Sequence, residues 1–165
     1  MPPYRLQTLL EIRERAEEAA KQAFSDAMIA LAKEVKEQQR LEEDLARRKV
    51  ERKAKVQAYM VEVMSRGVAA QGLSSINRFE ERLKDEEAQV ALEIEKQKEV
   101  VKAAERTVEE KRVAMAEAAT EKKAIEKHKE GWAKEVKKER DIREDLAQEE
   151  IGNTLHLARA RKLKS

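Results

Sequence analysis

Mostly apolar positions recur at alternating steps of three and four residues through the second half of the chain. Steps of this kind average about three and a half residues, which keeps one face of a slightly underwound helix turned toward a partner over many turns. The pattern therefore predicts a long coiled-coil arm. Its positions are Val90, Ile94, Gln97, Val101, Ala104, Val108, Lys111, Met115, Ala118, Lys122, Ile125, Lys129, Trp132 and Val136, with later ones at Leu146 and Glu150.

A less regular series of apolar residues runs through the first half of the chain, from Leu6 to Val63. Polar side chains such as Arg13, Gln38 and Arg52 interrupt it. Proline is tolerated at a helix start but not in a helix interior, so the prolines at positions 2 and 3 place the start just after them. We expect a first helical arm over residues 4–65 that pairs less tightly than the second.

Two glycines and three serines gather only in residues 65–75. Gly67 suits a left-handed helix end, and a serine at position 74 or 75 can cap a new helix. We therefore predict a hairpin tip at residues 66–75 and a second arm at residues 76–151. One continuous helix that dimerises is the alternative, and this break favours the hairpin. Val68 and Leu73 are candidate contact residues at the tip, with a merely permissive turn as the competing interpretation.

The expected fold is all-α: one elongated, monomeric, antiparallel coiled-coil hairpin whose second arm projects past the N-terminus. Gly152 and Asn153 predict a kink or an end of that arm. The tail that follows, residues 152–165, contains no acidic residue. It fits either a cationic helix end that is favourable to the helix dipole or a docking surface for an acidic partner.

The composition supports an elongated molecule. Charged residues make up 42% of the 165 residues and aromatic residues only 3%, so the chain can bury a narrow seam but not a broad core. The net charge of +2 gives no general attraction to nucleic acid or acidic membranes. There is no cysteine, no secretory signal at the start and no apolar stretch near the roughly 20 residues that cross a bilayer. We expect a soluble, cytoplasmic protein.

The motifs of common enzymes are missing from the sequence. No clustered glycines form a phosphate-binding loop, and His128 and His156 stand far apart without the spacing of a metal site. The basic run over residues 47–55 lacks interleaved aromatic residues, so we expect it to pair with acids of the facing arm rather than with nucleic acid. The sequence predicts a protein that is not an enzyme and has no cofactor or metal.

Three segments resemble a known family. Residues 4–17, Tyr-Arg-Leu-Gln-Thr-Leu-Leu-Glu-Ile-Arg-Glu-Arg-Ala-Glu, resemble the start of the FliJ/YscO family, the central stalk proteins of flagellar and virulence-type type III secretion systems. Residues 128–135 and 149–156 are similar to segments of the virulence-type members. The length and the expected hairpin fit this family over the whole chain.

The resemblance implies a non-catalytic cytoplasmic stalk, peripheral to the inner membrane and similar in shape to the coiled-coil rotor subunit of rotary ATPases. Such a stalk sits in the pore of a hexameric export ATPase and touches the export gate, and some members bind export chaperones. A generic coiled-coil scaffold or tether is the alternative, and an arm that binds unfolded clients or nucleic acid is a third hypothesis.

The resemblance also implies that the open end of the hairpin enters the ATPase pore. We expect its basic residues to form one cluster that an acidic collar holds through charge-assisted hydrogen bonds. The candidate ATPase-contact residues are Tyr4, Arg5, Gln7, Arg13, Arg15, Arg159, Arg161 and Lys162.

Overall fold

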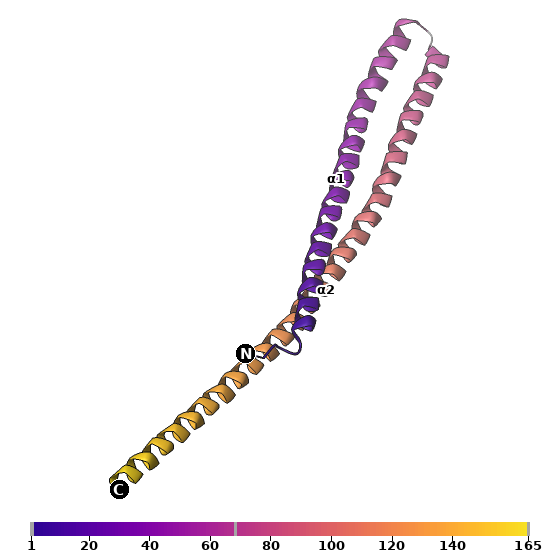
Figure 1. The fold of residues 1–165 in the computed structure, drawn as a ribbon. Helices are drawn as coiled ribbons and strands as arrows, with labels where there is room; N and C mark the ends of the chain where they lie inside the picture. Colours follow the sequence, from indigo (N-terminus) through magenta and orange to yellow (C-terminus); the bar gives the residue numbers. More distant parts are fainter. Residues whose placement is uncertain (1, 68, 165) are drawn as a thin grey trace. The chain divides into compact units, whose positions relative to one another are not determined.

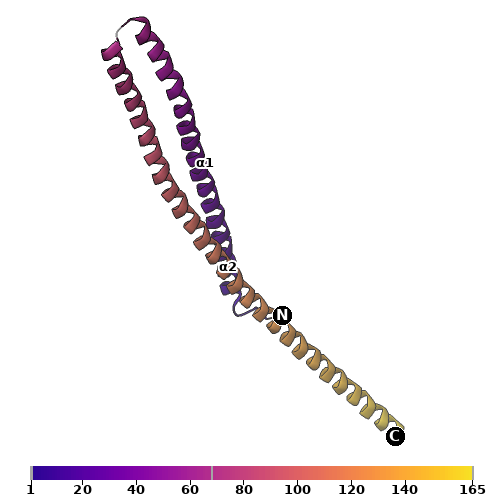
Figure 2. The same cartoon turned by 180° about the vertical axis from the view of Figure 1, so that it is seen from behind.

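The computed structural model describes residues 2–67 and 69–164, which form two long helices, α1 (Gln7–Ser65) and α2 (Ala69–Lys164). The helices pack against each other as an antiparallel hairpin, and the described residues contain no strand (Figures 1 and 2). This confirms the all-α hairpin. The contacts divide the chain into a terminal unit, Met1–Lys21 with Ala114–Ser165, and a tip unit, Gln22–Val113. Each unit is described by itself below.

The connection between the helices is shorter than the predicted tip. Gly67 has a φ of 73°, a left-handed conformation that glycine adopts without steric cost, and its N–H donates to the Met64 carbonyl at 3.3 Å. α2 begins at Ala69, well before the predicted residue 76. Val68 lies outside the described residues, and Leu73 is 54% exposed.

Gly72 explains why the sequence pattern placed this boundary too late. It lies inside α2 rather than in the turn, and it is buried. A Cβ atom at this position would lie 2.3 Å from Cγ1 of Val63 on α1. The glycine therefore permits close approach of the two helices beside the turn, and it does not end a helix.

The seam of the tip unit is narrow. Leu41 of α1 packs with Val90 and Ile94 of α2, each no more than 6% exposed, and Leu45 lies against this cluster. The three–four stripe predicted on α2 is buried or half-buried at every position from Val90 to Val136 except Lys111, which is exposed.

Two polar residues on the seam of the tip unit, Arg52 and Gln97, have partners across it, whereas Gln38 bonds to Glu42 of its own helix. Arg52 Nε donates to Glu87 Oε1 at 2.9 Å, and Glu87 is only 8% exposed. The side-chain amide of Gln97 donates to the Glu34 carboxylate at 2.7 Å and to its carbonyl oxygen at 2.9 Å. Pairs of this kind let charged positions face a helix partner without an unsatisfied buried charge.

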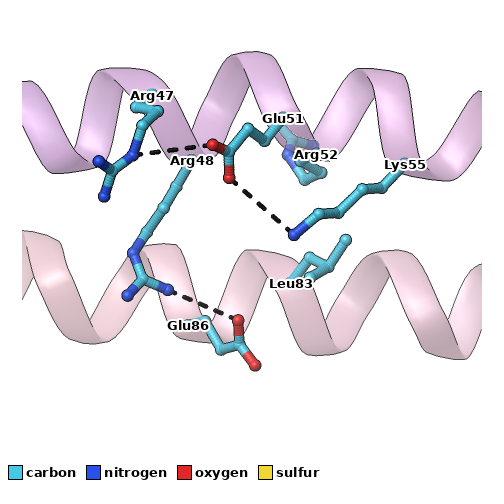
Figure 3. A pocket seen from close by; sticks show the side chains of 7 residues that line it. All are labelled: Arg47, Arg48, Glu51, Arg52, Lys55, Leu83 and Glu86. Atoms are coloured by element: carbon cyan, nitrogen blue, oxygen red, sulfur yellow. Dashed lines mark ion pairs between the residues drawn. The ribbon is translucent and has the colours of Figure 1, made fainter.

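Three residues of the basic run at 47–55 form the ion pairs that Figure 3 shows, Arg47, Arg48 and Lys55. Arg48 reaches Glu86 on the facing helix at 3.6 Å, which agrees with the expected pairing across the hairpin. Arg47 and Lys55 instead pair with Glu51 of their own helix, at 3.7 and 3.9 Å. The hollow that these residues line carries four basic and two acidic side chains, so its positive charge is partly offset.

In the terminal unit, α2 does not end at Gly152 but continues to Lys164. This differs from the predicted arm end at residue 151, because a single glycine in a helix costs only about 1 kcal/mol relative to alanine and strong helix formers follow it. Every described residue from Arg140 onward is exposed apart from Ala160. Among the residues that the structure describes, neither helix has an apolar stretch suited to spanning a bilayer.

Candidate functional site

The N-terminal segment of the terminal unit is fixed to α2 by Tyr4. This residue is 7% exposed, and its hydroxyl forms a hydrogen bond of 2.6 Å with Nδ1 of His128, in which the tautomer of the imidazole sets the donor. Its ring centroid lies 5.1 Å from that of Trp132. Tyr4 therefore faces α2 rather than solvent, and it holds the N-terminal segment against α2.

Gln7 has a similar position beside Tyr4. Its side-chain oxygen accepts a hydrogen bond from Nζ of Lys129 at 2.8 Å, and the same ammonium lies 5.9 Å from the Tyr4 ring centroid. Lys129 is a polar residue at a position of the predicted stripe. At this position the helix packs through a hydrogen bond and a cation–π contact instead of an apolar side chain. Gln7 is thus engaged within the unit as well.

Removal of the Trp132 indole should destabilise this anchor. Trp132 is half-buried and contacts the Tyr4 ring at a tilt of 48°, so we expect Trp132→Ala to lower the free energy of unfolding by about 2 kcal/mol, less than for a fully buried ring. Thermal unfolding followed by circular dichroism measures the effect. Tyr4→Phe, which keeps the ring and removes the hydroxyl, should cost about 1 kcal/mol. An unchanged melting temperature for Trp132→Ala would make Trp132 a partner contact instead.

Glu17 is a buried carboxylate held by two lysines from the two helices. It is 8% exposed, and its oxygens lie 2.7 Å from Nζ of Lys21 and 3.5 Å from Nζ of Lys122. The hydrogen bond from Lys21, with the nearby charge of Lys122, lowers the pKa of Glu17 below its ordinary value of 4.5, although burial acts in the opposite direction. Lys122 is another polar stripe position whose role is an ion pair across the seam.

The lowered pKa predicts a pH-dependent contribution of Glu17 to stability. The contribution is fully present above the ordinary value of 4.5 and is lost as the pH falls through the lowered pKa of the folded state. Glu17→Gln should therefore lower the melting temperature at neutral pH, and the difference from the parent chain should shrink in acid. A difference that stays constant across this pH range would contradict the assignment.

The three N-terminal arginines do not have equal roles. Arg13 donates to Glu121 of α2 at 2.6 Å, which fixes it within the terminal unit. Arg5 and Arg15 are exposed, and neither has a carboxylate within ion-pair distance among the described residues. Arg5 and Arg15 are therefore the basic groups of this segment that are available to a partner.

The C-terminal basic residues lie elsewhere on the terminal unit. A hollow lined by Pro2 and Arg143 marks where the N-terminal segment stops covering α2. Arg159 lies 23 residues beyond the end of the seam at Val136, which corresponds to roughly 35 Å along the helix. The structure thus separates Arg159, Arg161 and Lys162 from the N-terminal arginines instead of forming the single basic cluster that we expected.

The Tyr4–His128 contact was not predicted from the sequence, in which His128 was considered only as a possible metal ligand. His128 is exposed as a whole, and only its Nδ1 atom reaches Tyr4. Its position four residues before Trp132, on the same side of the helix, was the available signal. Among the described residues, no group of His, Cys, Asp and Glu side chains could hold a metal ion.

The chain matches the family model described as YscO-like protein over residues 1–162. Its fold is similar to the solved structure of CT670 from Chlamydia trachomatis, described as a proposed YscO homolog, with a TM-score of 0.80 and 23% sequence identity. That match covers 98% of this chain and 99% of the other. No curated protein matches the sequence. Because the family model spans nearly the whole chain, the protein belongs to the YscO-like family of type III secretion-associated proteins.

Proposed function

We propose that this chain is the non-catalytic central stalk of a type III secretion export ATPase and couples the hexameric ATPase to the export gate. The observation that carries the proposal is the C-terminal part of α2 in the terminal unit. From Arg140 to Lys164 it is an exposed helix that continues beyond the N-terminal segment, in a chain of the YscO-like family. A helix end of this kind can enter a ring pore that a compact domain could not.

Exposed basic groups at this end support contact with an acidic collar of the ATPase. They form two zones, Arg5 and Arg15 near the N-terminus and Arg159, Arg161 and Lys162 on the projecting helix. In this proposal the two zones, one at the N-terminal segment and the start of α1 and the other near the end of α2, contact different levels of the pore. Charged contacts at the rim of an interface mainly set the encounter rate and the orientation, so binding should weaken as salt is added.

The tip end of the hairpin supports contact with a different partner, the export gate. No charged residue occurs in residues 67–77, in a chain that is 42% charged. Val61, Met64 and Leu73 are each more than half exposed beside the turn. An uncharged apolar end is suited to an apolar surface of a partner rather than to an acidic collar. In this proposal Val68 and Leu73 belong to the gate-facing end, and the stalk remains in the cytoplasm, peripheral to the inner membrane.

In this proposal, export chaperones are a further class of partner and bind the charged outer faces of the two helices. A generic coiled-coil tether remains the alternative function. It joins two proteins but changes no enzymatic rate, and that difference separates the two functions.

The proposal is tested by adding the purified chain to the hexameric secretion ATPase of the same system and measuring the rate of ATP hydrolysis. A stalk should raise the rate in a salt-sensitive way. A tether should bind without changing the rate, and an RNA or DNA mobility shift that salt removes would instead favour nucleic-acid binding.

A further inference from the structure

The projecting part of α2 has a divided charge. Residues 139–150 carry six carboxylates and only two arginines, a net charge of −4. Residues 151–164 carry four basic residues and no acid, a net charge of +4. The two halves therefore have equal and opposite charge along one exposed helix. Two such helices attract each other when they run antiparallel and repel each other when they run parallel and in register.

The same helix continues the three–four stripe beyond the covered seam. Leu146 is 56% exposed, Leu157 is 59% exposed, and Ala160 lies further along the same face. The stripe is thus a direct continuation of the face that packs on α1 and the N-terminal segment. It has the spacing of a helix-pairing surface but no covering helix in the terminal unit.

We propose that the projecting helices of two copies of this chain pair antiparallel through this stripe. One register matches both the apolar and the charged positions. It places Leu146 against Leu157 of the second copy and Glu139 against its Lys164, and by symmetry each pair occurs twice. In the same register Glu150 faces Asn153, whose amide can donate to the carboxylate. A polar asparagine at a seam position is a known device for fixing register at some cost in stability.

The flanking positions of this register are mostly complementary. Ile142 lies beside Leu163 of the second copy, which is 89% exposed in the single chain, and Glu149 lies beside His156. One flank brings like charges together, Arg140 and Arg161. Glu144 lies 3.9 Å from Arg140 within its own helix and offsets part of this repulsion. With few apolar layers the dimer should be reversible and should depend on concentration.

This pairing does not depend on the stalk function, but a paired copy could not make the proposed ATPase contact. The second copy covers the same projecting helix that the proposed ATPase contact uses. A free dimer and an ATPase-bound single copy would then be mutually exclusive states. Loss of ATPase stimulation would leave the self-pairing intact, and loss of self-pairing would leave stimulation by the single copy intact.

The register is tested by disulfide trapping, since the natural chain contains no cysteine. In an antiparallel dimer of the Leu146→Cys variant alone, the thiols of the two copies lie roughly 16 Å apart along the helices. The same holds for a dimer of the Leu157→Cys variant alone. A mixture of the two variants places the thiols in one layer. We expect disulfide dimers from the mixture and few from either variant alone. Self-linked dimers from each single variant would show parallel pairing and overturn the proposal.

Sedimentation of matched variants provides the second measurement. Leu157→Asp changes a stripe residue, and Leu155→Asp changes a residue that is exposed to nearly the same extent, 56%, on the other side of the same helix. We expect Leu157→Asp to weaken dimerisation about tenfold or more, and Leu155→Asp to leave it unchanged, with equal helicity by circular dichroism. A chain that stays monomeric at its highest soluble concentration, or equal effects of both substitutions, would overturn the proposal.

Discussion

Charge reversal at Arg5, Arg15, Arg159 and Arg161 together, each to Glu, is expected to abolish stimulation of the export ATPase. All four side chains are exposed in the terminal unit, so the change should leave the packing of the hairpin intact. Under the proposed stalk function, each reversal replaces an attraction to an acidic collar by a repulsion, and the combined loss is expected to exceed about a hundredfold in affinity. The measurement is the ATPase rate as a function of added chain.

Arg13 is left out of this variant because Arg13→Glu would break its ion pair with Glu121 and place two carboxylates together. The matched control is Lys49→Glu with Lys53→Glu, two exposed lysines of the tip unit. This control and Leu73→Ala at the tip should retain stimulation. If the tip variant loses stimulation and the fourfold variant keeps it, the assignment of the two ends is reversed.

The seam was predictable from sequence because helix periodicity alone defines it. The stripe from Val90 to Val136 has the expected burial, and even its polar members Gln97, Lys122 and Lys129 face the partner helix. These three are kept on the seam by a carboxylate or an amide across it, at Glu34, Glu17 and Gln7. Spacing alone predicts that these polar positions lie on the seam, but it does not predict which residues they contact. Lys111 has the spacing but is exposed.

The tip boundary could not be predicted from composition, because a glycine has two different uses. Gly67 adopts a left-handed conformation and ends a helix, whereas Gly72 makes room for Val63 inside the next helix. Only the three-dimensional approach of the two helices separates these uses. Gly152 is a third case, a glycine within a helix that has open space around it.

The candidate site was predicted in part. The N-terminal segment and the projecting helix both belong to the terminal unit, but the register of the hairpin determines which of their residues remain exposed. That register turns Tyr4 and Gln7 toward α2 and gives Arg13 an ion pair, while Arg5 and Arg15 remain exposed. Arg13 and Arg15 differ because two successive helical steps of about 100° place their side chains on nearly opposite sides of α1.

The second large effect is expected from Leu41→Ala in the tip unit. Leu41 is 6% exposed and forms a cluster of buried apolar residues with Val90 and Ile94. Truncation should lower the free energy of unfolding by about 3 kcal/mol, because a two-helix seam has no second layer of side chains that could move into the cavity. For a chain of this size the melting temperature should fall by roughly 6–12 °C.

The matched control for Leu41→Ala is Val50→Ala, since Val50 lies on the same helix and is 70% exposed. It should change the free energy of unfolding by less than about 0.5 kcal/mol, because its side chain loses little contact on truncation. Both variants are compared by thermal and urea unfolding. Equal effects at the two positions would show that the apolar seam contributes little and that the ion pairs across it, such as Arg52 with Glu87, hold the helices together.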